Sequence, residues 1–113
     1  MRITFENNVA VVTGGSKGMG GSTTTRLLEE GASTAALDVD EKRGAARIAE
    51  YPDRGLFIKC DVSDSTQVTA AFDQVLERFG GVDILVNNAG FITGQPVRID
   101  GGLVALIHNP IRI

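Results

Sequence analysis

The stretch that most restricts how this chain can fold is residues 9–20, VAVVTGGSKGMG. Four consecutive apolar residues lead into a threonine, which predicts a strand over residues 9–13 that is buried on both faces, as in a parallel sheet. The glycines that follow permit a tight turn and a close approach of backbone N–H groups to another group. Residues 22–30 then predict a helix that ends at Gly31. A strand, a glycine turn and a helix N-terminus in this order predict an anion site, because unpaired N–H groups and the helix dipole point to one place.

The rest of the chain continues the alternation of strand and helix. Further strands are predicted over residues 33–39, 56–60 and 83–86, and further helices over residues 41–50 and 65–79. Asp40 is a suitable N-cap for the first of these helices, and Ser63 or Asp64 for the second. The order β-α-β-α-β-α-β predicts an α/β fold with a parallel sheet and helices on both faces. Right-handed crossovers make 3-2-1-4 the expected strand order.

This strand order places the glycine turn where ligands bind in such sheets. The ends of the first and fourth strands lie side by side and form the topological switch point. Asp38 ends the second strand, where its carboxylate can accept hydrogen bonds from an adenosine ribose 2′-hydroxyl and would repel a 2′-phosphate. This favours NAD over NADP as the cofactor, although Lys17 and Arg43 would soften the preference. A solvated charge at a strand end is the alternative for Asp38, and a turn that binds nothing is the alternative for the glycines.

Taken together, these residues resemble the short-chain dehydrogenase/reductase family over residues 7–102. Four motifs carry the likeness: Thr13-Gly14-x-x-x-Gly18-x-Gly20, Asp38, the pair Asp61-Val62, and Asn87-Asn88-Ala89-Gly90. The resemblance implies a Rossmann-type domain and hydride transfer between NAD(P) and an alcohol or ketone. It also implies the cofactor-binding residues Gly14, Ser16, Lys17, Gly18, Met19, Gly20, Asp38, Asp61, Val62, Asn88, Ala89 and Gly90.

The chain departs from the family where the chemistry is done. The resemblance implies a catalytic tyrosine with a lysine four residues later, but Tyr51 is the one tyrosine here and Gly55 stands four residues on. Residues 91–95 and 97–102 resemble the family's C-terminal strand region and follow the NNAG motif directly, as if a central block were missing. We therefore expect a cofactor-binding half over residues 1–90, a C-terminal segment over residues 91–113, and no catalytic residue.

The missing block has a structural consequence for the fourth strand. Without its usual neighbour this apolar strand becomes an edge, which invites self-association. Only residues 91–96 connect the motif to residues 97–99, and a parallel crossover needs a dozen or more residues. We therefore expect residues 97–99 to return antiparallel or to stay unpaired. The apolar tail, residues 103–107, would pack over the gap or against a second chain.

Composition excludes several other classes of function. The chain has 113 residues and a net charge of −3, which does not favour nucleic acid or an anionic membrane as a partner. No apolar run approaches a membrane span, and the first residues lack the apolar core of a signal peptide. One cysteine and one histidine supply neither a disulfide nor a cluster of metal ligands. These features favour a reducing cytoplasm, with Cys60 as a small buried hydrophobe.

Three alternatives to a catalytically incomplete, NAD-binding protein stay open at this point. The first is an active oxidoreductase of the same family with a rebuilt or intermolecular site. The second is a serine hydrolase, because Gly14-x-Ser16-x-Gly18 also fits the nucleophile-elbow pattern, with Asp83 or Asp100 and His108 as partners. The third is a chain that does not fold stably, because a small domain with half a sheet buries little surface.

Overall fold

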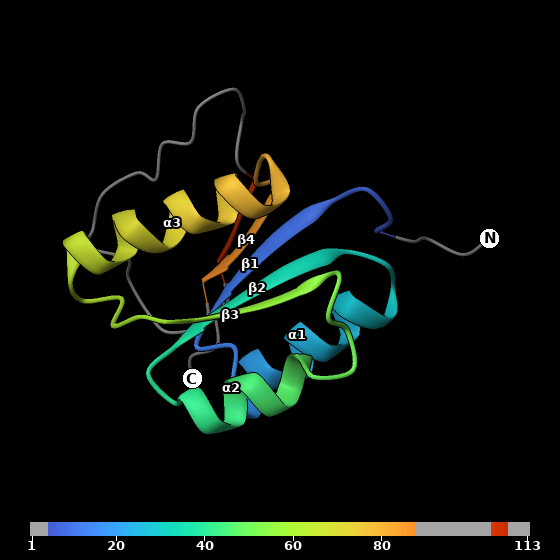
Figure 1. The fold of residues 1–113 in the computed structure, drawn as a ribbon, viewed down its shortest axis with the longest axis horizontal. Helices are drawn as coiled ribbons and strands as arrows, with labels where there is room; N and C mark the ends of the chain where they lie inside the picture. The colour runs from blue at the N-terminus through green and yellow to red at the C-terminus, as the bar shows by residue number, and fades with distance from the viewer. Residues whose placement is uncertain (1–4, 88–104, 109–113) are drawn as a thin grey trace.

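The computed structural model describes residues 5–87 and the strand at 105–108, and it has the expected alternation. In chain order the elements are β1 (Val9–Thr13), α1 (Gly18–Glu29), β2 (Ser33–Asp38), α2 (Glu41–Ile48), β3 (Gly55–Lys59), α3 (Ser65–Phe79), β4 (Ile84–Asn87) and β5 (Ala105–His108). All strands are parallel, in the order β3-β2-β1-β4-β5 (Figure 1). The predicted fold class and the predicted order 3-2-1-4 are confirmed.

The sheet separates two hydrophobic layers, with α3 on one face and α1 and α2 on the other (Figure 1). Alternate residues of β1 point to opposite layers, so Val9 and Val11 pack with α3, while Ala10 and Val12 pack on the side of α1. Every residue of β1 is buried, as predicted for a central parallel strand. Full burial of an aliphatic side chain stabilises the fold by about 1.5–3 kcal/mol, so these two layers hold the strand ends in place.

Helix α3 has the boundaries that the sequence predicts. The carboxylate of Asp64 accepts hydrogen bonds from the N–H groups of Thr66 and Gln67, which identifies it as the N-cap. At the other end Gly80 has a φ of 85°, the left-handed conformation that commonly ends helices. The buried residues of α3 form one stripe against the sheet, Val68, Ala71, Phe72 and Val75.

Helix α1 begins four residues earlier than predicted, at Gly18 rather than at position 22. The N–H of Gly21 donates to the carbonyl of Lys17 at 3.0 Å, so the helix already starts inside the glycine turn. Glycine and threonine are weak helix formers. Tertiary packing outweighs that preference, because Leu27 and Leu28 are buried beneath the sheet. The other boundaries differ from the predicted ones by at most two residues.

The strand that covers β4 comes from the apolar tail, which the sequence expected to pack over this gap or against a second chain. β5 pairs with β4 in parallel, with Ile84 opposite Ala105 and Asn87 opposite His108. The paired segment belongs to the apolar tail, and residues 88–104 separate the two strands. That separation exceeds the dozen or so residues that a parallel crossover needs, whereas the six-residue link considered before does not. Residues 97–99 lie outside the described part of the chain. The β4 edge is therefore occupied, and the expected self-association through it loses its structural basis.

None of the described helices is long and apolar enough to cross a membrane.

Candidate cofactor-binding site

The glycine turn leaves the carboxyl end of β1 and is fastened to β2. The N–H of Gly14 donates to the carbonyl of Leu37 at 2.8 Å. Gly14 and Gly18 have φ values of 65° and 60°, a left-handed conformation that residues with a Cβ rarely adopt. The glycines at these positions therefore permit the chain to reverse between β1 and α1 within four residues, as the sequence predicts.

The N-terminus of α1 faces this turn without a side-chain cap. Lys17 is the N-cap residue and is extended, with φ −145° and ψ 170°, and its side chain makes no capping hydrogen bond. The first turn of α1 contains no acidic residue. Its backbone N–H groups and the positive end of the helix dipole can therefore serve an anionic group. Lys17, Gly18 and Met19 are exposed there, so a ligand can reach them.

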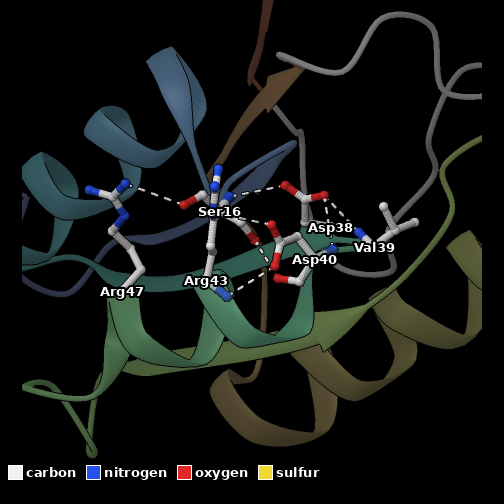
Figure 2. Close-up of polar contacts among 6 residues, drawn as sticks. All are labelled: Ser16, Asp38, Val39, Asp40, Arg43 and Arg47. Atoms are coloured by element: carbon white, nitrogen blue, oxygen red, sulfur yellow. Dashed lines mark hydrogen bonds and ion pairs between the residues drawn. The ribbon is translucent and has the colours of Figure 1, made fainter.

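Ser16 joins the turn to the connection between β2 and α2. Its backbone N–H donates to Oδ2 of Asp38 at 3.1 Å, and its Oγ donates to the carbonyl of Asp40 at 3.1 Å. Its own carbonyl accepts a hydrogen bond of 3.3 Å from Nη2 of Arg47 (Figure 2). Ser16 is only 1% exposed. All three of its polar groups are thus occupied within the protein, and its side chain is covered.

Asp38 lies at the end of β2 and is half-buried. Its Oδ2 accepts from Ser16, while its Oδ1 accepts from the N–H groups of Val39 at 2.7 Å and Asp40 at 3.3 Å (Figure 2). A carboxylate offers about four acceptor positions, so three internal donors leave room for about one further hydrogen bond. Asp38 therefore combines a structural role with the capacity to receive one ligand hydroxyl. The side chain of Val39 beside it is 58% exposed and adds an apolar surface at this edge.

Asp61 and Val62 come to the same edge from β3. Asp38 stands opposite Lys59 in the β2–β3 register, and the N–H of Cys60 donates to the carbonyl of Asp38 at 2.9 Å. The Asp61 carboxylate accepts from the hydroxyl of Ser63 at 2.7 Å and from its N–H at 3.0 Å. These two hydrogen bonds, the hydroxyl first, lower the pKa of Asp61 below its ordinary value. Val62 is half-buried and packs on the layer under α3.

The ends of β1 and β4 are joined by a pair of polar side chains. The hydroxyl of Thr13 lies 3.0 Å from Oδ1 of Asn87 and 3.4 Å from the carbonyl of Val86, and both side chains are buried. Thr13 and Asn87 are also partners in the parallel register. This contact joins β1 to β4 at the topological switch point that the strand order predicts. Asn88, Ala89 and Gly90, the other members of the NNAG motif, lie outside the described residues.

A cleft of about 790 Å³ runs between α1 and α2 from this edge. Ser16, Lys17 and Gly18 line it on one side, and Arg43 and Arg47 line it from α2. Arg43 is exposed and lies 3.6 Å from the carboxylate of Asp40. The cationic groups that would soften a preference for NAD are therefore next to the turn. Within the described ranges no three His, Cys, Asp or Glu side chains gather as metal ligands would.

The arrangement gives no support to a serine hydrolase. The Oγ of Ser16 is buried and donates to a backbone carbonyl, so it does not face a substrate. Asp83, one expected acid, accepts from the N–H of Val9 at 2.8 Å, at the opposite end of β1. A five-residue strand separates the two ends by roughly 15 Å. A triad that uses Asp83 is therefore not assembled, and Asp100, the other expected acid, lies outside the described residues.

The chain matches the family model described as short chain dehydrogenase over residues 8–100. The chain belongs to this family. A 3beta-hydroxysteroid dehydrogenase of Mediterraneibacter gnavus is 40% identical to this chain over 91 residues, covering 78% of this chain and 33% of the relative. Momilactone A synthase of Oryza sativa is 39% identical over 89 residues, covering 78% of this chain and 32% of the relative.

A solved structure agrees with these sequence matches. The 3-ketoacyl-(acyl-carrier-protein) reductase from Brucella melitensis, complexed with NADH, superposes with a TM-score of 0.70 at 34% identity. The superposition covers 74% of this chain and 34% of the reductase. The chain thus spans about a third of the length of the curated relatives that it matches.

One group at the site, Arg47, carries no sequence signal of its own. Arg47 is one of several charged residues in α2, and nothing in its position indicates that it reaches Ser16. Asn87 was noticed as part of a motif, but its contact with Thr13 depends on the strand register. Sequence reasoning does not identify Arg47, because only the packing of distant elements brings it to the turn.

Proposed function

We propose that this chain holds the adenosine and diphosphate of a dinucleotide at the carboxyl edge of its sheet. The observation that carries the proposal is the glycine turn itself, which presents the uncapped N-terminus of α1 directly beside Asp38. An uncapped helix N-terminus favours a diphosphate, and the remaining acceptor position of Asp38 suits a ribose hydroxyl. Membership of the family and the NADH complex of the Brucella reductase support the same assignment.

We propose NAD as the preferred cofactor, with NADP as the weaker ligand. The negative charge of Asp38 would repel a 2′-phosphate, and its two oxygens already receive three internal donors. Lys17 and Arg43 act in the opposite direction, because both are exposed cations that line the neighbouring cleft. Asp61, Val62, Met19 and Gly20 complete the proposed contacts, together with Asn88, Ala89 and Gly90.

We further propose that the chain does not transfer hydride by itself. Reduction of a ketone needs a proton donor within hydrogen-bond reach of the substrate oxygen. The family resemblance assigns that role to a tyrosine with a lysine four residues later, a pair that this sequence lacks. Tyr51 instead lies in the connection that leads into the start of β3, and its carbonyl accepts from the N–H of Gly55 at 2.6 Å. A reducing, cytoplasmic setting suits the free, buried Cys60.

Titration with NADH, NADPH and ADP-ribose, followed by calorimetry, tests the cofactor assignment. We expect saturable binding of NADH and ADP-ribose with similar affinity and weaker binding of NADPH. Asp38→Asn keeps the shape of the side chain but removes its charge, so it should reduce the discrimination between NADH and NADPH. Asp73→Asn, an exposed residue of α3, is the matched control. A folded sample without saturable NADH binding would refute the assignment.

An activity screen separates the incomplete protein from an oxidoreductase with a rebuilt or intermolecular site. The absorbance of NADH is followed with a panel of ketones, and that of NAD with secondary alcohols, over a range of protein concentrations. The proposal expects no turnover above buffer. Turnover that rises more steeply than the protein concentration would instead indicate a site shared between chains.

A further inference from the structure

The carbonyl of Ser16 accepts a hydrogen bond from the guanidinium of Arg47. Arg47 lies outside the glycine turn and is not among the proposed cofactor contacts. Arg47, in the last turn of α2, is half-buried and donates from Nη2 to that carbonyl at 3.3 Å. Its Nη1 donates to Oγ1 of Thr25 in α1 at 3.1 Å. Figure 2 shows the contact with Ser16, and together the two donors of one planar group connect the turn before α1 to the body of α1.

This contact controls a backbone group that faces the other way. A peptide unit is planar and trans, so its N–H points opposite to its carbonyl. Holding the carbonyl of Ser16 toward α2 therefore directs the N–H of Lys17 away from α2. On the helix side the carbonyl of Lys17 accepts from the N–H of Gly21 at 3.0 Å, but Lys17 is extended and Gly18 has a positive φ, so the Ser16–Lys17 peptide itself is not part of the helix.

We propose that Arg47 is a positioning residue for the dinucleotide site, which it serves by orienting the Ser16–Lys17 peptide. This inference rests on the proposed function, since it concerns the affinity of the same site. The guanidinium fixes the direction of the Lys17 N–H before the ligand arrives. Affinity then rises because that part of the turn need not be ordered on binding.

Arg54 is a matched control at the opposite end of α1. It is also half-buried, and its Nη1 donates to the carbonyls of Leu28 and Ala32 at 2.8 and 3.0 Å. Both arginines therefore fasten backbone carbonyls from the layer of α2 and β3, but only Arg47 does so beside the glycine turn. Lys42 is a control for charge, because it is an exposed cation of the same helix.

The experiment measures the NADH dissociation constant and the thermal midpoint of Arg47→Met, Arg54→Met and Lys42→Met. We expect Arg47→Met to bind NADH about tenfold more weakly, the effect of losing hydrogen bonds from a charged donor. Arg54→Met should lower the thermal midpoint at least as much yet keep its dissociation constant within about twofold of the wild type. Lys42→Met should change neither, since an exposed charge is screened by salt.

Two further measurements separate positioning from general destabilisation. In ¹H–¹⁵N spectra of the free protein, the Lys17 amide resonance should move in Arg47→Met and stay in place in Arg54→Met. Arg47→Lys keeps the charge, but an ammonium group lacks the two fixed donors that reach the Ser16 carbonyl and the Thr25 hydroxyl together. We therefore expect about threefold weaker NADH binding. This variant decides the question if Arg47→Met does not fold.

The outcomes distinguish the two proposals. If the wild type does not bind NADH, the proposed function itself is wrong. If the wild type binds and both Arg47 variants bind equally well, the positioning role is refuted while the cofactor assignment stands. Equal weakening by Arg54→Met, or by Lys42→Met, would likewise refute the positioning role, because stability or charge alone would then explain the loss.

Discussion

Replacing Asp38 by alanine tests whether this carboxylate is part of the fold or only a solvated charge at a strand end. The substitution removes the acceptor of three backbone donors, the N–H groups of Ser16, Val39 and Asp40. Ser16 is 1% exposed, so water does not readily replace its lost acceptor, and an unsatisfied buried N–H costs about 1–3 kcal/mol. The N–H groups of Val39 and Asp40 lie nearer to solvent and add roughly 0.5 kcal/mol each after rehydration.

The free energy of unfolding of Asp38→Ala should therefore fall by about 2–4 kcal/mol, a large part of the 5–15 kcal/mol that is typical of small domains. Urea unfolding followed by circular dichroism measures it. Asp38→Asn keeps one carbonyl oxygen for Val39 and Asp40 but loses the acceptor of Ser16, so we expect a loss of about 1–3 kcal/mol. Asp53→Ala, an exposed aspartate between α2 and β3, is the control and should stay within about 0.5 kcal/mol of the wild type. An equally small change for Asp38→Ala would show that the carboxylate is only solvated and that its hydrogen bond with the N–H of Ser16 adds nothing to stability.

The other predictions concern packing, capping and pH. A Cβ added at Gly44 would collide with the ring of Phe57 and lie 2.8 Å from Oγ of Ser16, so Gly44→Ala should lower the free energy of unfolding by about 1–3 kcal/mol and weaken NADH binding; unchanged values of both would contradict this packing. Asp64→Ala removes the N-cap of α3 and should cost about 1 kcal/mol in the same urea assay, with Asp73→Ala as the neutral control. Burial, followed by the charges of Asp61 and Asp64, raises the pKa of the Cys60 thiol above its ordinary value of 9.0. The unfolded chain then loses this proton first as the pH rises, so stability should decrease above about pH 9. Cys60→Ala should remove that part of the decrease, and a pH dependence identical to that of the wild type would disprove the assignment.

The predicted strand order depended on local patterns that tertiary packing had no reason to override. The run of apolar residues in β1 is long enough to be buried on both faces, and the stripe of α3 fits one layer only. Alternating strands and helices, with right-handed crossovers and helices on both faces of the sheet, then favour the order 3-2-1-4 for the first four strands. The placement of Asp38 and Asp61 at one edge follows from that arrangement alone.

Two features were not predicted from the sequence because the deciding interactions are not local. Helix α1 begins at Gly18, inside a segment of weak helix formers, since the burial of Leu27 and Leu28 stabilises it as a whole. The β4 edge is covered by Ala105–His108, in parallel, because the pairing partner lies farther along the chain than the nearest apolar segment. Sequence patterns identify apolar segments but do not say which segment a strand edge will select.

By itself, the sequence determined the α/β class, the order of the first four strands and the edge that carries the glycine turn, because hydrophobic period and glycine position act over a few residues. Only the tertiary structure decided that Ser16 is buried with all three polar groups occupied, and that Arg47 holds its carbonyl. These contacts join residues 22 to 31 positions apart. The physical reason is that such hydrogen bonds form only after β2 and α2 have packed beside the turn, and no local preference encodes them.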